Sequence, residues 1–272
     1  YGIIELINFA HGEIYMLGAF TALLVAGVLG IVGFPAGGIL IVAALAAVVW
    51  SAAYGYTLEK VAYKPLRGAP RLSPLISAIG MSIFLQNYVL LAQTSDYVPF
   101  PRLLPEMEFL DYLGNIMGPS DFLILVTSTL AMVSLSLFIR YTRMGKAMRA
   151  TAQNRKMALL LGINADRIIS LTFIVGSALA ALGGVLIASH MGQVNFGIGF
   201  LAGLKAFTAA VLGGIGSIPG AMVGGLVLGI AESMTTGYLS GNYEDALAFA
   251  LLILILIFRP DGILGKAKVQ KV

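Results

Sequence analysis

The stretch IYMLGAFTALLVAGVLGIVGFPAGGILIVAALAAVVWSAAYGYTL (Ile14–Leu58) contains no Asp, Glu, Lys or Arg, and it decides the class of the fold. A helix needs about 20 apolar residues to cross the hydrocarbon core of a bilayer, so this stretch is long enough for two crossings. Glycines and a proline interrupt it between Gly30 and Gly38, and such residues mark turns. We therefore expect two membrane helices, near 14–32 and 37–58, with Gly33 and Pro35 in the break.

Further charge-free windows follow along the chain. They cover 72–95, 122–139 and 168–189, and a last window at 246–258 extends upstream through Tyr243, which places Glu244 and Asp245 at the membrane surface. Residues 200–239 are interrupted, so we expect a short helix of about 12 residues, a break and a longer helix there. The residues of this second break are Gly213, Gly214, Gly216, Pro219 and Gly220.

The composition agrees with a membrane protein. Hydrophobic residues make up 58% of the chain and charged residues 11%, and the mean hydropathy is +0.92, which leaves too little polar surface for a soluble globule. The sequence predicts an all-α polytopic membrane helix bundle of about seven or eight helices, in one domain over residues 1–272. Tyr1 is neither an initiator Met nor the start of a signal peptide, so we expect the natural chain to begin further upstream.

The basic residues predict the orientation of the bundle, because Lys and Arg near helix ends stay on the cytoplasmic side. Loops 59–71 and 140–167 and the C-terminal tail hold 15 of the 17 Lys and Arg residues. The alternate connections carry Arg102 alone against Asp96, Glu106, Glu108, Asp111, Asp121, Glu244 and Asp245. The C-terminus is therefore expected in the cytoplasm, and the net charge of +4 needs no nucleic-acid partner.

Two segments of the chain resemble each other. Residues 8–38 match residues 195–225 without gaps, and eight of the fifteen positions from Asn8 to Ala22 are identical in the second copy. A chain rich in Gly and Ala also matches itself by composition, but Asn-Phe and Phe-Thr-Ala recur in register. The charge rule starts the two copies from opposite sides of the membrane, so we predict an inverted repeat, with broken helices that line a solute path near the midplane.

The two breaks also supply candidate residues for that path. They are Asn8, His11, Gly12, Glu13, Asn195, Phe196, Gly199 and Lys205. We expect Asn8 and Asn195 to cap helices at equivalent positions.

Ionisable groups near membrane segments are costly, and those nearest here are Glu5, His11, Glu13, Lys205 and Glu232. His11, Glu13 and Lys205 have two interpretations, helix packing at the membrane interface or a polar gate on the path. Two histidines and no cysteine are too few for a metal site, so none is predicted.

A second constellation is the long basic loop, TRMGKAMRATAQNRKMALLLGIN (Thr142–Asn164). Met144, Ala147, Met148 and Thr151 share one helical face, which predicts an amphipathic helix ending near Gln153. Asn154 can cap a second short helix that stops at Gly162, and Asn164 can cap the next membrane helix. Such a pair of helices suits docking into a groove of a partner protein, or lies on anionic lipid as an interfacial helix.

These motifs together resemble a known family. The loop residues Gly145–Ala150, Asn154, Ala158 and Gly162–Asn164 are similar to the loop by which ABC permeases couple to their ATPase. With INFAHGE (7–13), KPLRGA (64–69), GGIGSIPGA (213–221) and FRPDGILG (258–265), the whole chain resembles the first, H-type permease of bacterial high-affinity branched-chain amino acid importers. The resemblance implies one more helix upstream of Tyr1.

The resemblance also implies roles and partners. The ATPase-coupling residues would be Gly145, Lys146, Arg149, Asn154, Ala158, Gly162, Ile163 and Asn164, within a coupling element at 143–164. The expected partners are a second related permease, two cytoplasmic ATPases and a periplasmic protein that captures leucine, isoleucine or valine. The chain has no Gly-x-x-x-x-Gly-Lys-[Ser/Thr] loop, so no cofactor is expected on it, and ATP and Mg²⁺ would bind the ATPases.

Other functions remain as alternatives. Related permeases move urea, amides or other amino acids, and the binding protein usually selects the cargo. An ion-coupled secondary transporter would need acidic residues deep in the membrane, where Glu232 is the plausible example. An integral-membrane enzyme would need clustered catalytic groups at one membrane face, and no such cluster stands out. The expected mechanism is alternating access driven by ATP on the partner subunits, in the inner membrane.

Overall fold

The computed structural model describes residues 8–70, 72–101, 103 and 118–265, and seven helices in these ranges are long and apolar enough to cross a membrane. They are α1 (His11–Ile31), α2 (Ala36–Leu58) with its π-helical continuation η1 (Glu59–Tyr63), α3 (Leu72–Ala92), α4 (Pro119–Tyr141), α7 (Ala165–Met191), α9 (Ile218–Tyr238) and α10 (Glu244–Phe258), which follows a 3-10 turn, η3 (Gly241–Tyr243). The shorter α8 (Ile198–Gly213) has 16 residues rather than the expected 12 or so. The predicted all-α membrane bundle is confirmed.

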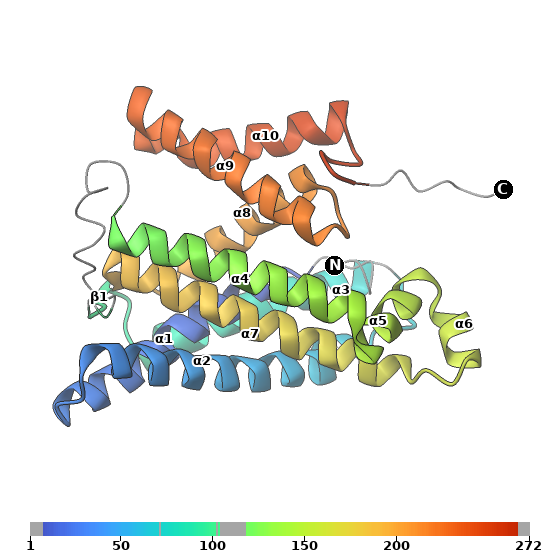
Figure 1. Ribbon diagram of the computed structural model, residues 1–272, viewed down its shortest axis with the longest axis horizontal. Helices are drawn as coiled ribbons and strands as arrows, with labels where there is room; N and C mark the ends of the chain where they lie inside the picture. Colours follow the sequence, from blue (N-terminus) through green and yellow to red (C-terminus); the bar gives the residue numbers. More distant parts are fainter. Residues whose placement is uncertain (1–7, 71, 102, 104–117, 266–272) are drawn as a thin grey trace.

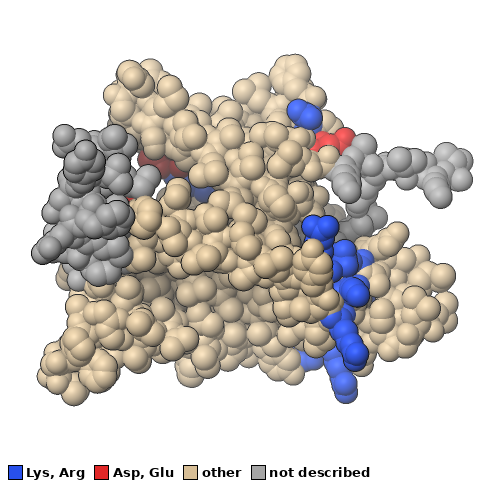
Figure 2. Space-filling model, viewed as in Figure 1, with Lys and Arg blue, Asp and Glu red and all other residues tan. Residues whose placement is uncertain are grey.

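The long helices run along the long axis of the molecule, and the basic segments gather at one end of it (Figure 1). There α5 (Arg143–Gln153) and α6 (Arg155–Leu160) form a protrusion, and the loop after η1 and the segment after α10 lie at the same end. Figure 2 shows Lys and Arg side chains at the same end, which we call the basic end; the other is the distal end. The predicted positions Glu5, Arg102, Glu106, Glu108 and Asp111 lie outside the described residues, as do the helix expected before Tyr1 and the end of the basic tail.

The two repeats run in opposite directions. The turn between α1 and α2 lies at the distal end, whereas the turn between α8 and α9 lies at the basic end (Figure 1). The breaks contain Gly33, Gly214 and Gly216, all with positive φ, together with Pro35. Gly213, Pro219 and Gly220 were predicted in the second break but belong to the adjoining helices, because Ser217 caps α9 and Pro219 fits its first turn. The inverted pair of broken helices is otherwise as predicted.

The core of the bundle surrounds α7, which packs against α1 and α2. Small residues set the spacing: Gly18 of α1 faces Ala181, and Gly55 of α2 faces Ser177, so close that a Cβ would collide with α7. Lipid gives no hydrophobic drive for helix association, so close approach through small residues stabilises such a bundle.

The distal end of this core is closed by two short strands. β1 (Val98–Pro99) pairs antiparallel with β2 (Gln193–Val194), and the Phe100 amide donates to the Gly192 carbonyl at 2.8 Å. Phe100, Leu103 and Val194 are buried there. The segment after α3 is thus fastened to the end of α7.

The segment after α10 folds back onto the α8–α9 break. The amides of Ile263 and Leu264 donate to the carbonyls of Leu212 and Gly213, at 2.9 and 3.0 Å. Gly262 and Gly265 approach Gly214 so closely that a Cβ on Gly262 would lie 2.4 Å from the Gly214 Cα. We call residues 259–265 the tail clamp.

Candidate functional site

The N-terminal turns of α1 and α8 meet at equivalent glycines of the two repeats. A Cβ on Gly12 would lie 2.1 Å from the carbonyl oxygen of Gly199, and a Cβ on Gly199 would lie 2.7 Å from that of Gly12. The two repeats therefore touch at equivalent glycines, and no larger side chain fits there.

Glu13 lies beside this contact and is completely buried. Ser82 of α3 donates its hydroxyl to Oε1 of Glu13 at 2.9 Å, while Oε2 lies against Gly199 and accepts no hydrogen bond within the described residues. A carboxylate is favoured at the N-terminus of a helix by the partial positive charge there. Glu13 thus joins α1 to α3 and to the first turn of α8.

The predicted asparagine caps are wrong. The side chain of Asn8 accepts a hydrogen bond from the hydroxyl of Tyr63 at 2.7 Å, and α1 begins after Ala10 without a side-chain cap. Asn195 accepts from the amide of Gly197 at 3.1 Å, which stabilises a turn ahead of α8 and does not cap the helix. Asn8 instead has a partner far away in the sequence.

Lys205 does not join Glu13 or His11 in a polar gate. Its ammonium contacts the carboxylates of Glu232 at 3.2 Å and Asp245 at 3.1 Å, and it donates to Glu244 as well. His11 lies against Gly176 of α7. In the described part of the chain, the salt bridges of Lys205 fasten α8 to α9 and α10, which favours a packing role over the predicted gate.

The loop at the basic end folds as its sequence predicts. Thr142 caps α5, Asn154 caps α6 through the amide of Met157, and Asn164 caps α7 through the amide of Arg167, the last two at 3.1 Å. Gly162 has a φ of +79° after α6 ends. The two short helices are therefore held in place by local caps.

Burial divides the predicted coupling residues. Gly145 and Ala158 are buried and hold the pair of helices against the bundle, together with Met148 and Thr151. Met144 was expected on the buried face but is exposed, because Gly145 takes the position against the backbone of α4.

Besides Met144, four apolar side chains of the element are exposed, and their exposure was not predicted. They are Met157, Leu159, Leu160 and Leu161, on α6 and the residue after it. The run of three leucines in a charged loop was the available signal. We call these four residues the apolar tip.

A cleft of about 390 Å³ separates α5 from the second repeat. Met148 and Arg149 line it from α5, Thr172 from α7, and Gly214 and Ser217 from the α8–α9 break. The element and the second repeat thus face each other across a gap at the basic end.

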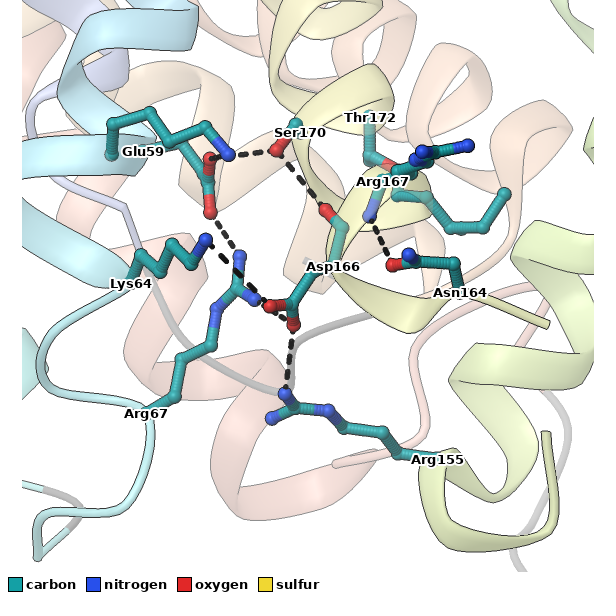
Figure 3. Close-up of polar contacts among 11 residues, drawn as sticks. Glu59, Lys64, Arg67, Arg155, Asn164, Asp166, Arg167, Ser170 and Thr172 are labelled. Carbon is teal, nitrogen blue, oxygen red and sulfur yellow. Dashed lines mark hydrogen bonds and ion pairs between the residues drawn. The ribbon is translucent and has the colours of Figure 1, made fainter. Parts of the chain in front are cut away.

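A network of charges lies where η1, α6 and α7 meet (Figure 3), and it is buried at Glu59 and Arg67 and exposed at Asp166. Arg67, from the loop after η1, contacts both Glu59 of η1 and Asp166 of α7. Asp166 also accepts from Arg155 of α6 at 3.2 Å, and Ser170 donates to Glu59 at 2.7 Å. Arg67 was noted from the sequence in the charge rule and in the KPLRGA motif, but Glu59 and Asp166 were assigned no role, because Asp166 lies far along the chain from Arg67 and Glu59.

Comparison with known proteins adds a family to this geometry. The family model described as "Branched-chain amino acid transport system / permease component" matches residues 1–256. The chain is 52% identical to the high-affinity branched-chain amino acid transport system permease protein LivH of Escherichia coli K12, over all of this chain and 90% of that protein. It is equally similar, at 52% and the same coverage, to the permease protein BraD of Pseudomonas aeruginosa. No solved structure matches the chain.

Proposed function

This chain belongs to the family of permease components of branched-chain amino acid transport systems, and from this premise we propose how it moves its cargo. It is the membrane permease of an ATP-driven importer of branched-chain amino acids, a transport subunit rather than an enzyme. ATPase and binding-protein partners follow from that class of machine. We further propose that it pairs with a second related permease and two ATPases in the inner membrane, with the basic end and the C-terminus in the cytoplasm.

The observation that carries the coupling role is the apolar tip at the basic end. Leu160 is 81% exposed on a protrusion whose own helices are capped and held in place. Exposed leucines clustered on a short helix fit a groove in a partner, as in other helix-in-groove contacts. In our proposal the tip enters a groove on the ATPase, while Gly145, Asn154, Ala158, Gly162 and Asn164 shape the element and Lys146, Arg149 and Ile163 flank it.

The transport step would use the two broken-helix repeats. Closure of the ATPases on ATP would move the 143–164 element, and the repeats would rock about the Gly12–Gly199 contact so that the path opens to one side at a time. Asn8, His11, Glu13, Asn195 and Phe196 lie in or near the two N-terminal turns that meet there, and we propose that they line the path. The α5 cleft leaves room for such a movement at the basic end.

The test is ATP-dependent uptake of labelled leucine into liposomes that contain the chain with its partner permease, ATPases and binding protein. We expect uptake by the parent and at least about a tenfold loss in Leu160→Asp, because charging a central apolar contact removes about 2 kcal/mol or more of interface energy. Leu160→Met, which keeps an apolar side chain of similar size, should retain uptake. ATP-independent uptake by the parent, or full uptake by Leu160→Asp, would contradict the coupling role.

A further inference from the structure

The π-helix η1 stands between the α5–α6 element and the start of α1. It continues α2 at the basic end and carries Glu59 and Tyr63, which face different neighbours. π-helical turns are rare and occur frequently at functional sites.

On the side of α7, Glu59 is held by a bridging cation. The Glu59 side chain is 0% exposed and Arg67 is 10% exposed, and the same guanidinium also contacts Asp166. Burying charges costs solvation energy that is recovered only with good geometry, so separating Glu59 from Arg67 would leave an uncompensated buried charge. The planar guanidinium, with five donors, can serve two carboxylates at once, which a lysine ammonium does less well.

On the outward side, the network reaches the α5–α6 element. Arg155, the first residue of α6, donates to Asp166 at 3.2 Å, and Lys64 lies 3.8 Å from the same carboxylate. Figure 3 shows these side chains converging on Asp166 from η1's loop and from α6. Asp166 is thus shared by the membrane helix and the protruding element.

On the inward side, η1 reaches the start of α1. The Tyr63 hydroxyl donates to the Asn8 side chain at 2.7 Å, and the Tyr63 ring packs on Phe173 of α7 with centroids 5.1 Å apart. Asn8 lies only a few residues before Gly12, where the two repeats touch. A continuous set of contacts therefore joins α6 to the first turn of α1.

We propose that Glu59, Arg67 and Asp166 are positioning residues that make α6, η1 and the start of α7 move as one body, and so carry a displacement of the element to the first turn of α1 through Tyr63 and Asn8. This inference rests on the proposed function. It adds a set of residues that neither contact the cargo nor belong to the apolar tip.

The test measures how many leucine molecules are taken up per ATP hydrolysed by the purified complex in liposomes. Asp166→Asn is the suitable variant, because the Asp166 side chain is 43% exposed and its loss leaves the buried Glu59–Arg67 pair in place. We expect this ratio to fall by about fivefold or more, the lower bound of typical coupling between linked sites, while ATP hydrolysis per complex continues.

The controls separate this inference from a loss of structure and from the proposed function. Asp166→Glu keeps the carboxylate and should restore most of the ratio, and Asp96→Asn, an exposed acid near β1, should leave it unchanged. The network's role would be overturned if Asp166→Asn took up as many leucine molecules per ATP as the parent. It would also be overturned if Asp166→Glu lowered this ratio as much as Asp166→Asn does. Absence of ATP-driven uptake in the parent would instead overturn the proposed function.

Discussion

The close approach of α1 and α8 requires glycine at positions 12 and 199. Each glycine faces the backbone of the other, so a methyl group on either would meet a carbonyl oxygen. Glycine is otherwise unfavourable within a helix by about 0.5–1 kcal/mol relative to alanine. Its presence at two equivalent positions is explained by this close approach.

We predict that Gly12→Ala lowers the thermal stability of the detergent-solubilised protein, because overpacking a close contact costs about 1–3 kcal/mol. Gly27→Ala is the matched control: it lies in the same helix and a Cβ there meets nothing within 4 Å. The control should be as stable as the parent or slightly more so. A Gly12→Ala protein that unfolds at the parent's temperature would show that the two turns do not touch as described.

Side-chain contacts within a few residues of the chain could be predicted from the sequence, whereas contacts between distant segments could not. Asn154 and Asn164 were identified as caps correctly, because a cap bonds to an amide three residues away. Asn8 was not, because its partner Tyr63 is 55 residues away in the sequence. The salt bridges of Lys205 were not predicted for the same reason, since its acidic partners come from two other helices.

At the scale of elements, the helices could be predicted from the sequence, but the contacts that hold them to one another could not. Charge-free windows and Gly/Pro breaks located every membrane helix in the described part of the chain to within a few residues. The β1–β2 pair and the tail clamp depend on segments that meet only after folding. The motifs GGIGSIPGA and FRPDGILG were noted separately, and the structure brings them into contact.

The tail clamp leads to a prediction at this scale. Gly262 and Gly216 both have positive φ, but only Gly262 packs against Gly214, whereas a Cβ on Gly216 meets nothing within 4 Å. Alanine strains the backbone at both positions, and at Gly262 it also displaces the clamp. Hydrogen exchange in the α8–α9 turn should therefore be faster in Gly262→Ala than in Gly216→Ala, and equal rates in the two variants would argue against the clamp.

At the scale of the whole molecule, the inverted repeat was predictable because its two copies share a sequence pattern and opposite charge environments. Its symmetry is not complete. The α1–α2 turn is exposed at the distal end, where Ile31 is 89% exposed, whereas the tail clamp is hydrogen-bonded to the end of α8 at the α8–α9 turn. The ion network adds a second asymmetry, because it ties the α5–α6 element to the end of the first repeat.

The central claim is that the two repeats rock against each other when ATP binds the partner ATPases. Residues 1–272 contain no cysteine, so pairs of introduced cysteines can be spin-labelled without interference from native thiols of this sequence. One pair, Ile31→Cys with Tyr238→Cys, reports on the distal end, and a second, Gly68→Cys with Ile215→Cys, reports on the basic end; all four sites are exposed.

The decisive measurement is the distance within each labelled pair in the assembled complex, recorded by pulsed electron spin resonance with and without a non-hydrolysable ATP analogue. Alternating access predicts that the analogue changes the two distances in opposite directions, because one end opens as the other closes. Distances that stay constant, or that change in the same direction at both ends, would contradict the account.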